Sequence, residues 1–231
     1  MALLVRSWNL FHGNTLPPTR RSHLREMVEL AAAGAPDVLC LQEVPVWAVP
    51  RLAEWSGLRA ISAIARRGLQ PAALAGWITR LDNGLLRSAI TGQANAILVA
   101  PAHEATDLGQ VQISERGVER RVCHAVRVAG VIVANLHGSS IDGRPELAAA
   151  ELERACAFAE TLATAGEPVV IAGDYNLVEH VLAGYSPPGQ GIDHILVRGT
   201  GSTPLEVWPT DRRVQNGEVL SDHAPVELRV G

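Results

Sequence analysis

The chain is organised around the stretch Pro168–Asn176, which reads PVVIAGDYN. Its four apolar residues, Val169 to Ala172, predict a short strand that is buried on both faces. Gly173 lets the backbone turn where this strand ends, and side-chain alternation then places Asp174 and Asn176 on one side of the chain. A carboxylate and an amide at one strand end favour Mg²⁺ and phosphate over a soft metal.

The same Gly-Asp-x-Asn pattern also occurs in tight turns, where Asp and Asn cap backbone groups. The pattern alone therefore leaves two alternatives for Asp174 and Asn176, a functional site or a structural turn. The choice depends on whether other strands of the chain end in similar polar residues.

The composition indicates an ordinary globular protein. Of the 231 residues, 47% are hydrophobic and 19% are charged, and no Pro/Gly/Ser-rich linker divides them, so we expect a single domain over residues 1–231. The net charge is −4, and all 20 basic residues are Arg. This charge argues against a protein that coats nucleic acid, but a few Arg side chains could still bind phosphates.

Cysteine content and terminal sequence bear on the compartment. The three cysteines, Cys40, Cys123 and Cys156, lie far apart in apolar surroundings, which is typical of free thiols in a reducing compartment. The first nine residues do not resemble a signal peptide, and no apolar run approaches the length that spans a membrane. We therefore expect a cytoplasmic protein with no membrane association.

Further strands are expected on both sides of this stretch. Apolar patterns predict strands over 2–9, 38–41, 120–128, 131–135, 191–197 and 224–230, with others near 76–79, 94–99 and 203–209. Helices are expected over 20–33 and 144–165, because apolar residues recur at helical spacing and glycines follow.

Polar residues stand at the ends of these strands. The set comprises Asn9, Gln42 with Glu43, His137, Asp174 with Asn176, Asp193, and Asp222 with His223. Each residue taken alone has a structural alternative, such as a turn residue, a solvated strand end or a packed histidine. Six such clusters in one chain favour a common site.

This ordered set resembles the endonuclease/exonuclease/phosphatase superfamily, the deoxyribonuclease I-like proteins. The resemblance runs from residue 3 to residue 230 and implies an α/β fold, a four-layer α/β/β/α sandwich of two mixed sheets with outer helices. It also implies a site at one edge, where strands of both sheets converge. The superfamily's Gly-Asp-Phe-Asn is here Gly-Asp-Tyr-Asn, and its Gly-Asn-Ala is Ala94-Asn95-Ala96.

The resemblance implies roles for these residues. Glu43 would be the main ligand of Mg²⁺, or of Mn²⁺, with Asn9 and Asp222 close by. Asp174 would orient or deprotonate the attacking water, and Asn176 would donate a hydrogen bond to the scissile phosphate.

Three further residues would support the reaction. Asp193 would hold the imidazole of His223 and favour its charged form. His137 would donate to a phosphate oxygen or protonate the leaving group. The sequence leaves open whether Asp174 or His223 is the general base.

The function expected from this resemblance is a divalent-metal-dependent phosphoester hydrolase, with nuclease-type action on a phosphodiester favoured. One alternative is a phosphatase or phosphodiesterase acting on a small molecule, such as a sugar phosphate or lipid headgroup. Another is an inactive binding module on the same fold. The substrate is a phosphoester, nucleic acid among the candidates, and nothing in the sequence indicates a protein partner.

Overall fold

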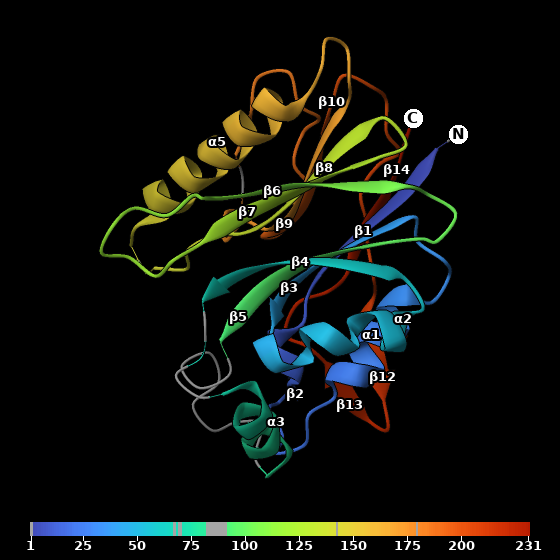
Figure 1. Ribbon diagram of the computed structural model, residues 1–231, viewed down its shortest axis with the longest axis vertical. Helices are drawn as coiled ribbons and strands as arrows, with labels where there is room; N and C mark the ends of the chain where they lie inside the picture. Colours follow the sequence, from blue (N-terminus) through green and yellow to red (C-terminus); the bar gives the residue numbers. More distant parts are fainter. Residues whose placement is uncertain (1, 67, 69–70, 82–91, 142, 179) are drawn as a thin grey trace.

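Two mixed β-sheets lie face to face in the computed structural model (Figure 1), which describes residues 2–66, 68, 71–81, 92–141, 143–178 and 180–231. In this part of the chain, one sheet contains six strands in the order β11-β14-β1-β3-β5-β4. Their bounds are Glu206–Val207, Val226–Val230, Leu3–Asn9, Val38–Val44, Gln93–Val99 and Arg59–Arg66, respectively.

The second sheet has the order β10-β9-β8-β7-β6 among the described residues. These strands span Asp193–Arg198, Val169–Asp174, Val131–His137, Val122–Val128 and Ala105–Gln112. A small third sheet joins β12 (Val214–Gln215), β13 (Glu218–Leu220) and β2 (Thr15–Leu16). The expected α/β class with mixed sheets is confirmed.

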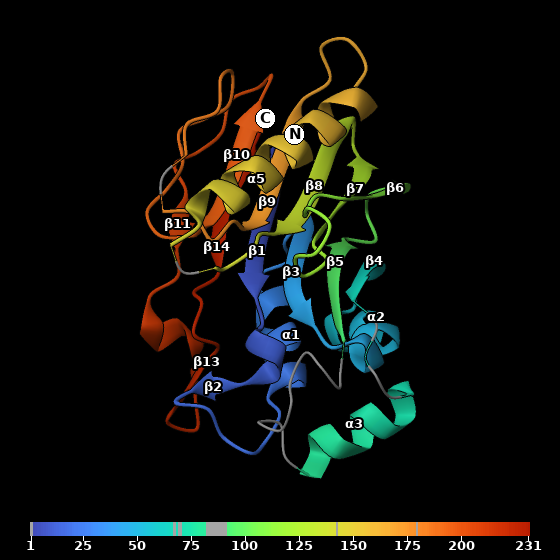
Figure 2. The same cartoon turned by 90° about the vertical axis from the view of Figure 1, so that its left-hand side faces the viewer.

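Helices cover the outer faces of the two large sheets (Figures 1 and 2). Helix α5 (Pro145–Leu162) packs on the second sheet, where Leu152 joins a buried cluster with Ile171 of β9. On the first sheet, α1 (Leu24–Ala32) contributes Met27 to a cluster with Leu39 of β3. The other helical segments among the described residues are α2 (Leu52–Ser56), α3 (Ala72–Leu81), and the short 3-10 turns Phe11–Gly13, Val46–Arg51 and Thr210–Arg213.

The space between the sheets is filled by aliphatic side chains from both of them. Val5 of β1, Val126 of β7 and Val170 of β9 belong to this inner cluster and are fully buried. Strand β9 therefore packs against the first sheet on one face and against α5 on the other. This explains why its sequence is apolar throughout, as expected for a strand covered on both faces.

The strand expected near Gly76–Thr79 is wrong, because these residues lie in helix α3. A short apolar run does not distinguish a strand from a helix, and here Pro71 stands just before the helix while alanines fill its first turn. Strands β4 and β6 were not expected. Most side chains of β6 face solvent, so its sequence lacks an apolar pattern.

No helix within the described ranges combines the length and apolar character needed to cross a membrane.

Candidate active site

Strand register sets a row of titratable residues at one end of the second sheet. In the parallel pair β8–β9, His137 lies opposite Asp174, and in the antiparallel pair β9–β10, Asp174 lies opposite Asp193. On the first sheet, the parallel pair β1–β3 places Asn9 opposite Gln42. These positions follow from backbone pairing alone, so the polar strand ends converge because the strands end together.

Asp174 stands at the centre of the row and is almost fully buried, at 1% exposure. Its Oδ2 accepts a hydrogen bond from Asn9 Nδ2 at 2.9 Å, and its Oδ1 accepts one from the backbone N–H of Asn176 at 3.0 Å. Burial, with the nearby charge of Asp193, raises the pKa of Asp174 to about 6. Oδ1 thus stabilises the turn at Asn176, while Oδ2 contacts the first sheet through Asn9.

Asp193 and His223 form the hydrogen-bonded pair that was expected. The His223 Nδ1 atom lies 2.8 Å from Asp193 Oδ2, and the other ring nitrogen lies 3.7 Å from Asp174 Oδ2. Burial opposes a charge on His223, but the hydrogen bond and charge of Asp193, helped by Asp174 and Asp222, outweigh it and raise the pKa to about 9. The ring is therefore cationic at neutral pH.

Glu43 enters the site through an irregularity in strand β3. The register between β3 and β5 shifts between Leu41 and Val44, and Glu43 has a positive φ of 53°. Such a bulge redirects a side chain that would otherwise continue the alternation. The Glu43 carboxylate lies 3.3 Å from His12 Nε2 and 3.8 Å from His137 Nε2.

Burial also affects the charge of Glu43. It raises the pKa of this residue to about 7, although a hydrogen bond from Asn9 opposes the shift. Asp174 and Asp222 act in the same direction as burial. Glu43 is thus a carboxylate whose negative charge is only partly compensated by the protein around it.

The protonation of His137 can be inferred from its donors. Gln93 Nε2 lies 2.6 Å from His137 Nδ1, and Arg121 Nη1 lies 3.0 Å from the same atom. Arg121 Nη1 also lies 3.4 Å from Nε2, but the Gln93 amide donates to Nδ1 alone, which favours the tautomer with the ring proton on Nε2. Burial and the positive charges of Arg121, His223 and His12 hold the pKa of His137 well below its usual value. His137 is therefore neutral, and its Nε2 atom lies 3.5 Å from Asp174 Oδ2.

Two of the expected polar residues have structural contacts. Asn176 has a positive φ of 53°, and its side chain donates to the carbonyl of Gly138 at 2.9 Å. Gln42 donates to Asn135 Oδ1 at 2.7 Å and to Ser7 Oγ at 3.1 Å, which links the two sheets. Asn176 thus has a structural role in the turn and also contacts the candidate site, because its backbone N–H donates to Asp174.

Sequence reasoning missed His12, Gln93 and Arg121 as site residues. His12 follows β1, Gln93 opens β5 and Arg121 precedes β7. Gln93 and Arg121 thus stand at strand ends, which is the signal that identified the others, whereas His12 lies in the 3-10 turn Phe11–Gly13. Arg121 is 8% exposed and is the guanidinium in contact with His137.

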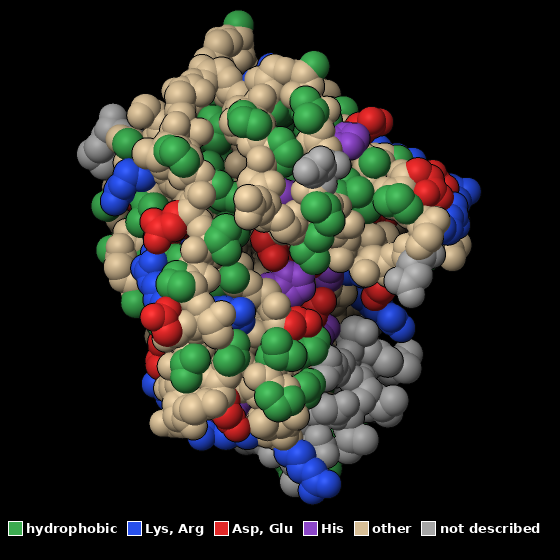
Figure 3. All heavy atoms as spheres, turned by 180° about the vertical axis from the view of Figure 1, so that it is seen from behind, with side chains coloured by type: hydrophobic (Ala, Val, Ile, Leu, Met, Phe, Trp, Pro, Cys, Tyr) green, Lys and Arg blue, Asp and Glu red, His purple; other side chains and the backbone are tan. Residues whose placement is uncertain are grey.

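The donors fit a hard cation. Figure 3 shows acidic and histidine side chains gathered in a hollow on one face of the molecule. Among the described residues, ligand atoms of Asp174, Asp193 and His223 lie within 4.8 Å of one another. This cluster differs from the expected ligands Asn9, Glu43 and Asp222, although Asp222 Oδ1 lies only 3.9 Å from His223 Nε2. Buried carboxylates with raised pKa values are the groups that a divalent cation would neutralise.

A family model and several solved structures match the chain. The model described as the Endonuclease/Exonuclease/phosphatase family matches residues 7–223. A search of curated proteins finds no match.

Three solved structures illustrate the fold. A functionally unknown conserved protein from Enterococcus faecalis V583 has 15% identity and a TM-score of 0.71, covering 99% of each chain. An endonuclease/exonuclease/phosphatase from Beutenbergia cavernae DSM 12333 has 18% identity and a TM-score of 0.70, covering 99% of this chain and 71% of that one. D. rerio TDP2 complexed with single strand DNA product has 15% identity and a TM-score of 0.67, covering 100% and 99%. At these identities the likeness shows the fold alone.

Proposed function

The chain belongs to the endonuclease/exonuclease/phosphatase family, and we propose that it is a Mg²⁺-dependent phosphoester hydrolase that uses an activated water, with a phosphodiester as its substrate. The observation that carries this proposal is the row His137–Asp174–Asp193, joined at one end of the sandwich by Glu43 and His223. It combines carboxylates for a hard cation with neutral and charged donors for phosphate oxygens.

We assign the metal site to Glu43, with Asn9 and Asp222 nearby. His223 is a weak candidate for a ligand, because its Nδ1 is engaged by Asp193 at 2.8 Å and its raised pKa keeps the other nitrogen protonated. The Glu43 carboxylate instead contacts His12, His137 and Asn9, and its raised pKa reflects burial that a bound cation would offset. When bound, Mg²⁺ or Mn²⁺ would neutralise charge that accumulates on the phosphate oxygens.

Asp174 is the better candidate for the general base. A base must be unprotonated at the working pH, and a pKa of about 6 meets this condition while leaving proton affinity for water. His223, with a pKa of about 9, is mostly protonated and suits electrostatic support of the phosphate instead. The Asn9 amide and the backbone N–H of Asn176 hold the Asp174 carboxylate in position.

His137 suits donation to a phosphate oxygen or to the leaving group, because its ring proton lies on Nε2, on the side of Asp174 and Glu43. The Gln93 amide favours this tautomer from the opposite nitrogen. The Asn176 amide donates to Gly138, so a role on phosphate would require it to exchange that partner.

The two candidate substrate classes are nucleic acid and a small phosphoester. The likeness to a TDP2 structure that contains a single strand DNA product supports nucleic acid. The net charge of −4 supports a smaller or less polyanionic substrate. An inactive binding module is the remaining alternative.

A substrate panel tests the proposal. Bis(p-nitrophenyl) phosphate, p-nitrophenyl phosphate, single-stranded DNA and RNA are incubated with the wild-type protein, with Mg²⁺, Mn²⁺ or EDTA. We expect diester hydrolysis that requires the metal and falls by on the order of 100-fold or more in Glu43→Gln, because metal-assisted charge stabilisation contributes several kcal/mol.

Glu29→Gln is the matched control, because Glu29 is an exposed glutamate on α1 that pairs with Arg25. Hydrolysis that persists in EDTA, or an unchanged Mg²⁺ dependence in Glu43→Gln, would contradict the assignment. Metal and DNA binding without turnover would favour the binding module.

A further inference from the structure

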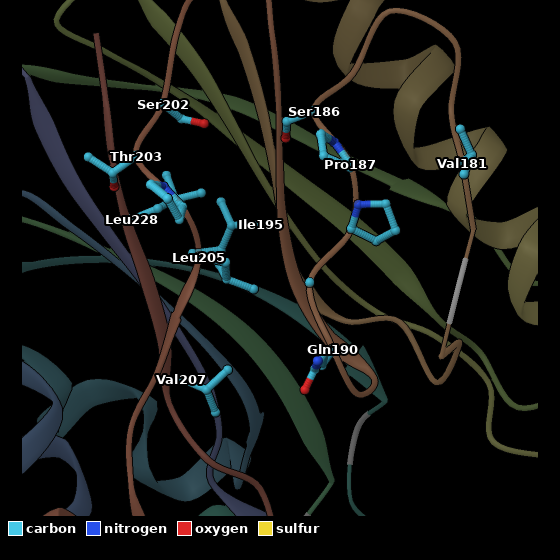
Figure 4. Close-up of a pocket in the computed structure, with 13 residues that line it drawn as sticks. Val181, Ser186, Pro187, Gln190, Ile195, Ser202, Thr203, Leu205, Val207 and Leu228 are labelled. Atoms are coloured by element: carbon cyan, nitrogen blue, oxygen red, sulfur yellow. The ribbon is translucent and has the colours of Figure 1, made fainter.

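A groove with a volume of about 830 Å³ opens along one side edge of the sandwich. It lies between the edge strand β10 of one sheet and the strands β14 and β11 of the other. Figure 4 shows Ile195, Leu205 and Leu228 in the middle of this groove, with Gln190 and Val207 at one end. The volume is in the range that accommodates a drug-sized organic group.

The groove has an apolar floor and partly apolar walls. Ile195 and Leu228 belong to the cluster between the sheets, and Leu205 packs against that cluster, so the inner core reaches the surface here. Val181 and Val207 stand in the walls at 82% and 46% exposure. Exposed valines beside such a floor leave apolar surface that a ligand could remove from water.

No charged side chain lines the groove within the described part of the chain; its polar lining residues are Ser186, Gln190, Ser202 and Thr203. A polyanionic strand needs cationic partners for its phosphates. The groove is therefore unsuited to a nucleic-acid backbone and suits an uncharged group.

The groove adjoins a cavity at the candidate active site. A second cavity of about 400 Å³ shares Gln190 and Val207 with it. Asp193, Asp222 and His223 line this second cavity. A molecule whose phosphate lies at the active site can thus extend through this cavity into the groove.

We propose that the groove binds one apolar alcohol group, alkyl or aryl, of the phosphodiester substrate. This inference rests on the proposed function and narrows its substrate class. In the reaction, the water oxygen forms a bond to phosphorus and the bond from phosphorus to one alcohol oxygen breaks. One water proton ends on the released alcohol, and the products are that alcohol and a phosphomonoester.

The test uses p-nitrophenyl phosphodiesters whose second alcohol is methyl, butyl, hexyl or phenyl. The released p-nitrophenol is the same in all four, so kcat/KM reports the second alcohol. Each buried CH₂ contributes about 0.8 kcal/mol, which corresponds to about a fourfold rise in kcat/KM per CH₂ as an upper bound. The butyl and hexyl arms report an alkyl group, and the phenyl arm reports an aromatic one.

Two variants locate the effect. Val207→Thr keeps the side-chain shape but places a hydroxyl in the wall, and Val181→Ser changes a side chain too exposed to affect folding. We expect each to lower the hexyl-to-methyl ratio of kcat/KM by roughly threefold. Val214→Thr is the matched control, because Val214 also lies in a two-residue strand and is 44% exposed.

The outcomes separate the two proposals. If kcat/KM of the wild type is the same for all four esters and the methyl ester is hydrolysed, the groove assignment is overturned and the proposed function stays intact. If no ester is hydrolysed, calorimetric binding of hexyl phosphate against methyl phosphate decides: tighter hexyl binding that Val207→Thr weakens supports the groove, and equal binding overturns it. An unchanged ratio in Val207→Thr, together with a changed sedimentation coefficient, would make the groove an interface between two copies and overturn the proposal.

Discussion

Asp174 Oδ2 and His223 Nε2 lie 3.7 Å apart. Their environments raise both pKa values, so that near neutral pH the carboxylate is negative and the imidazole is positive. The pKa of Asp174 rises to about 6 through burial and the charge of Asp193, and that of His223 rises to about 9 because carboxylates outweigh its burial. Between these values the carboxylate is ionised and the imidazole is cationic. Paired groups held in different states are typical of acid–base sites.

This arrangement predicts a bell-shaped dependence of kcat/KM on pH. The rate rises as Asp174 loses its proton near about pH 6 and falls as His223 loses its own near about pH 9. Asp193 raises both pKa values, so Asp193→Asn moves both limbs to lower pH and lowers the maximum. The measurement is the pH profile at saturating Mg²⁺.

Asp107→Asn is the control for this prediction, because Asp107 also pairs with a histidine, His124, at 2.9 Å, on another part of the molecule. It should leave both limbs in place. An alkaline limb that stays at its wild-type position in Asp193→Asn would contradict the coupling between Asp193 and His223.

Residue types at strand ends were enough to predict most of the candidate site. Glu43, Asp174, Asp193 and His223 each follow or open an apolar strand, so the sequence indicates both their position and their chemistry. Gln93 and Arg121 also stand at strand ends, but residue type at a strand end does not show that they contact His137, nor that His12, in the turn after β1, contacts Glu43. Such contacts depend on strand register, which the sequence does not show.

At the level of elements, Gly173 sets the spacing between β8 and β9. Its φ is 148°, and a Cβ atom there would lie 2.0 Å from the carbonyl oxygen of Leu136 on β8. No flexible side chain is involved, so relief requires the two backbones to separate. The same pair of strands holds His137 opposite Asp174.

Gly173→Ala should therefore lower both stability and activity. We expect a loss of about 3 kcal/mol in the free energy of unfolding, measured by urea titration, and weaker activity per folded molecule. Gly201→Ala is the control, since a Cβ atom added at Gly201 would have open space for 4 Å around it and the φ of this residue is not in the left-handed region. A Gly173→Ala protein with wild-type stability would show that β8 and β9 tolerate separation.

Elements differ in how far the sequence predicts them. Strand β9 is apolar because it is covered on both faces, and it was predicted from that pattern. Strand β6 lies at an edge of its sheet with most side chains exposed, so no apolar pattern indicates it. Helix α3 was misread as a strand over four residues, because helical periodicity needs a longer run to become visible.

At the level of the whole molecule, one ion pair ties the second sheet to the loop after α5. Glu167 accepts hydrogen bonds from Arg127 Nε at 2.6 Å and from the backbone of Thr164 at 3.0 Å. The Arg127 bond lowers the pKa of Glu167 to about 2, against the opposing effect of burial. Because this pKa is lower in the folded protein, the ionised Glu167 stabilises the fold at pH values above about 4.5, its pKa in the unfolded chain. This contribution is lost as the pH falls toward about 2.

Glu167→Gln should have a lower Tm than the wild type at pH 7, by a few degrees, and the difference should shrink as the pH falls from about 4.5 to about 2. Thermal unfolding followed by circular dichroism across this range measures it. Glu153→Gln, which removes an exposed carboxylate on α5, provides the comparison. A Tm difference that is constant with pH would show that the charge of Glu167 is not the cause.

The measurement that tests the metal assignment most directly is anomalous diffraction from crystals grown with Mn²⁺. We predict an anomalous peak at the shared end of the two sheets, against the oxygens of Glu43 with Asn9 and Asp222 nearby, and no such peak in Glu43→Gln crystals. A wild-type crystal with no peak in this hollow, or a peak that survives in Glu43→Gln on Asp174, Asp193 and His223, would contradict the assignment.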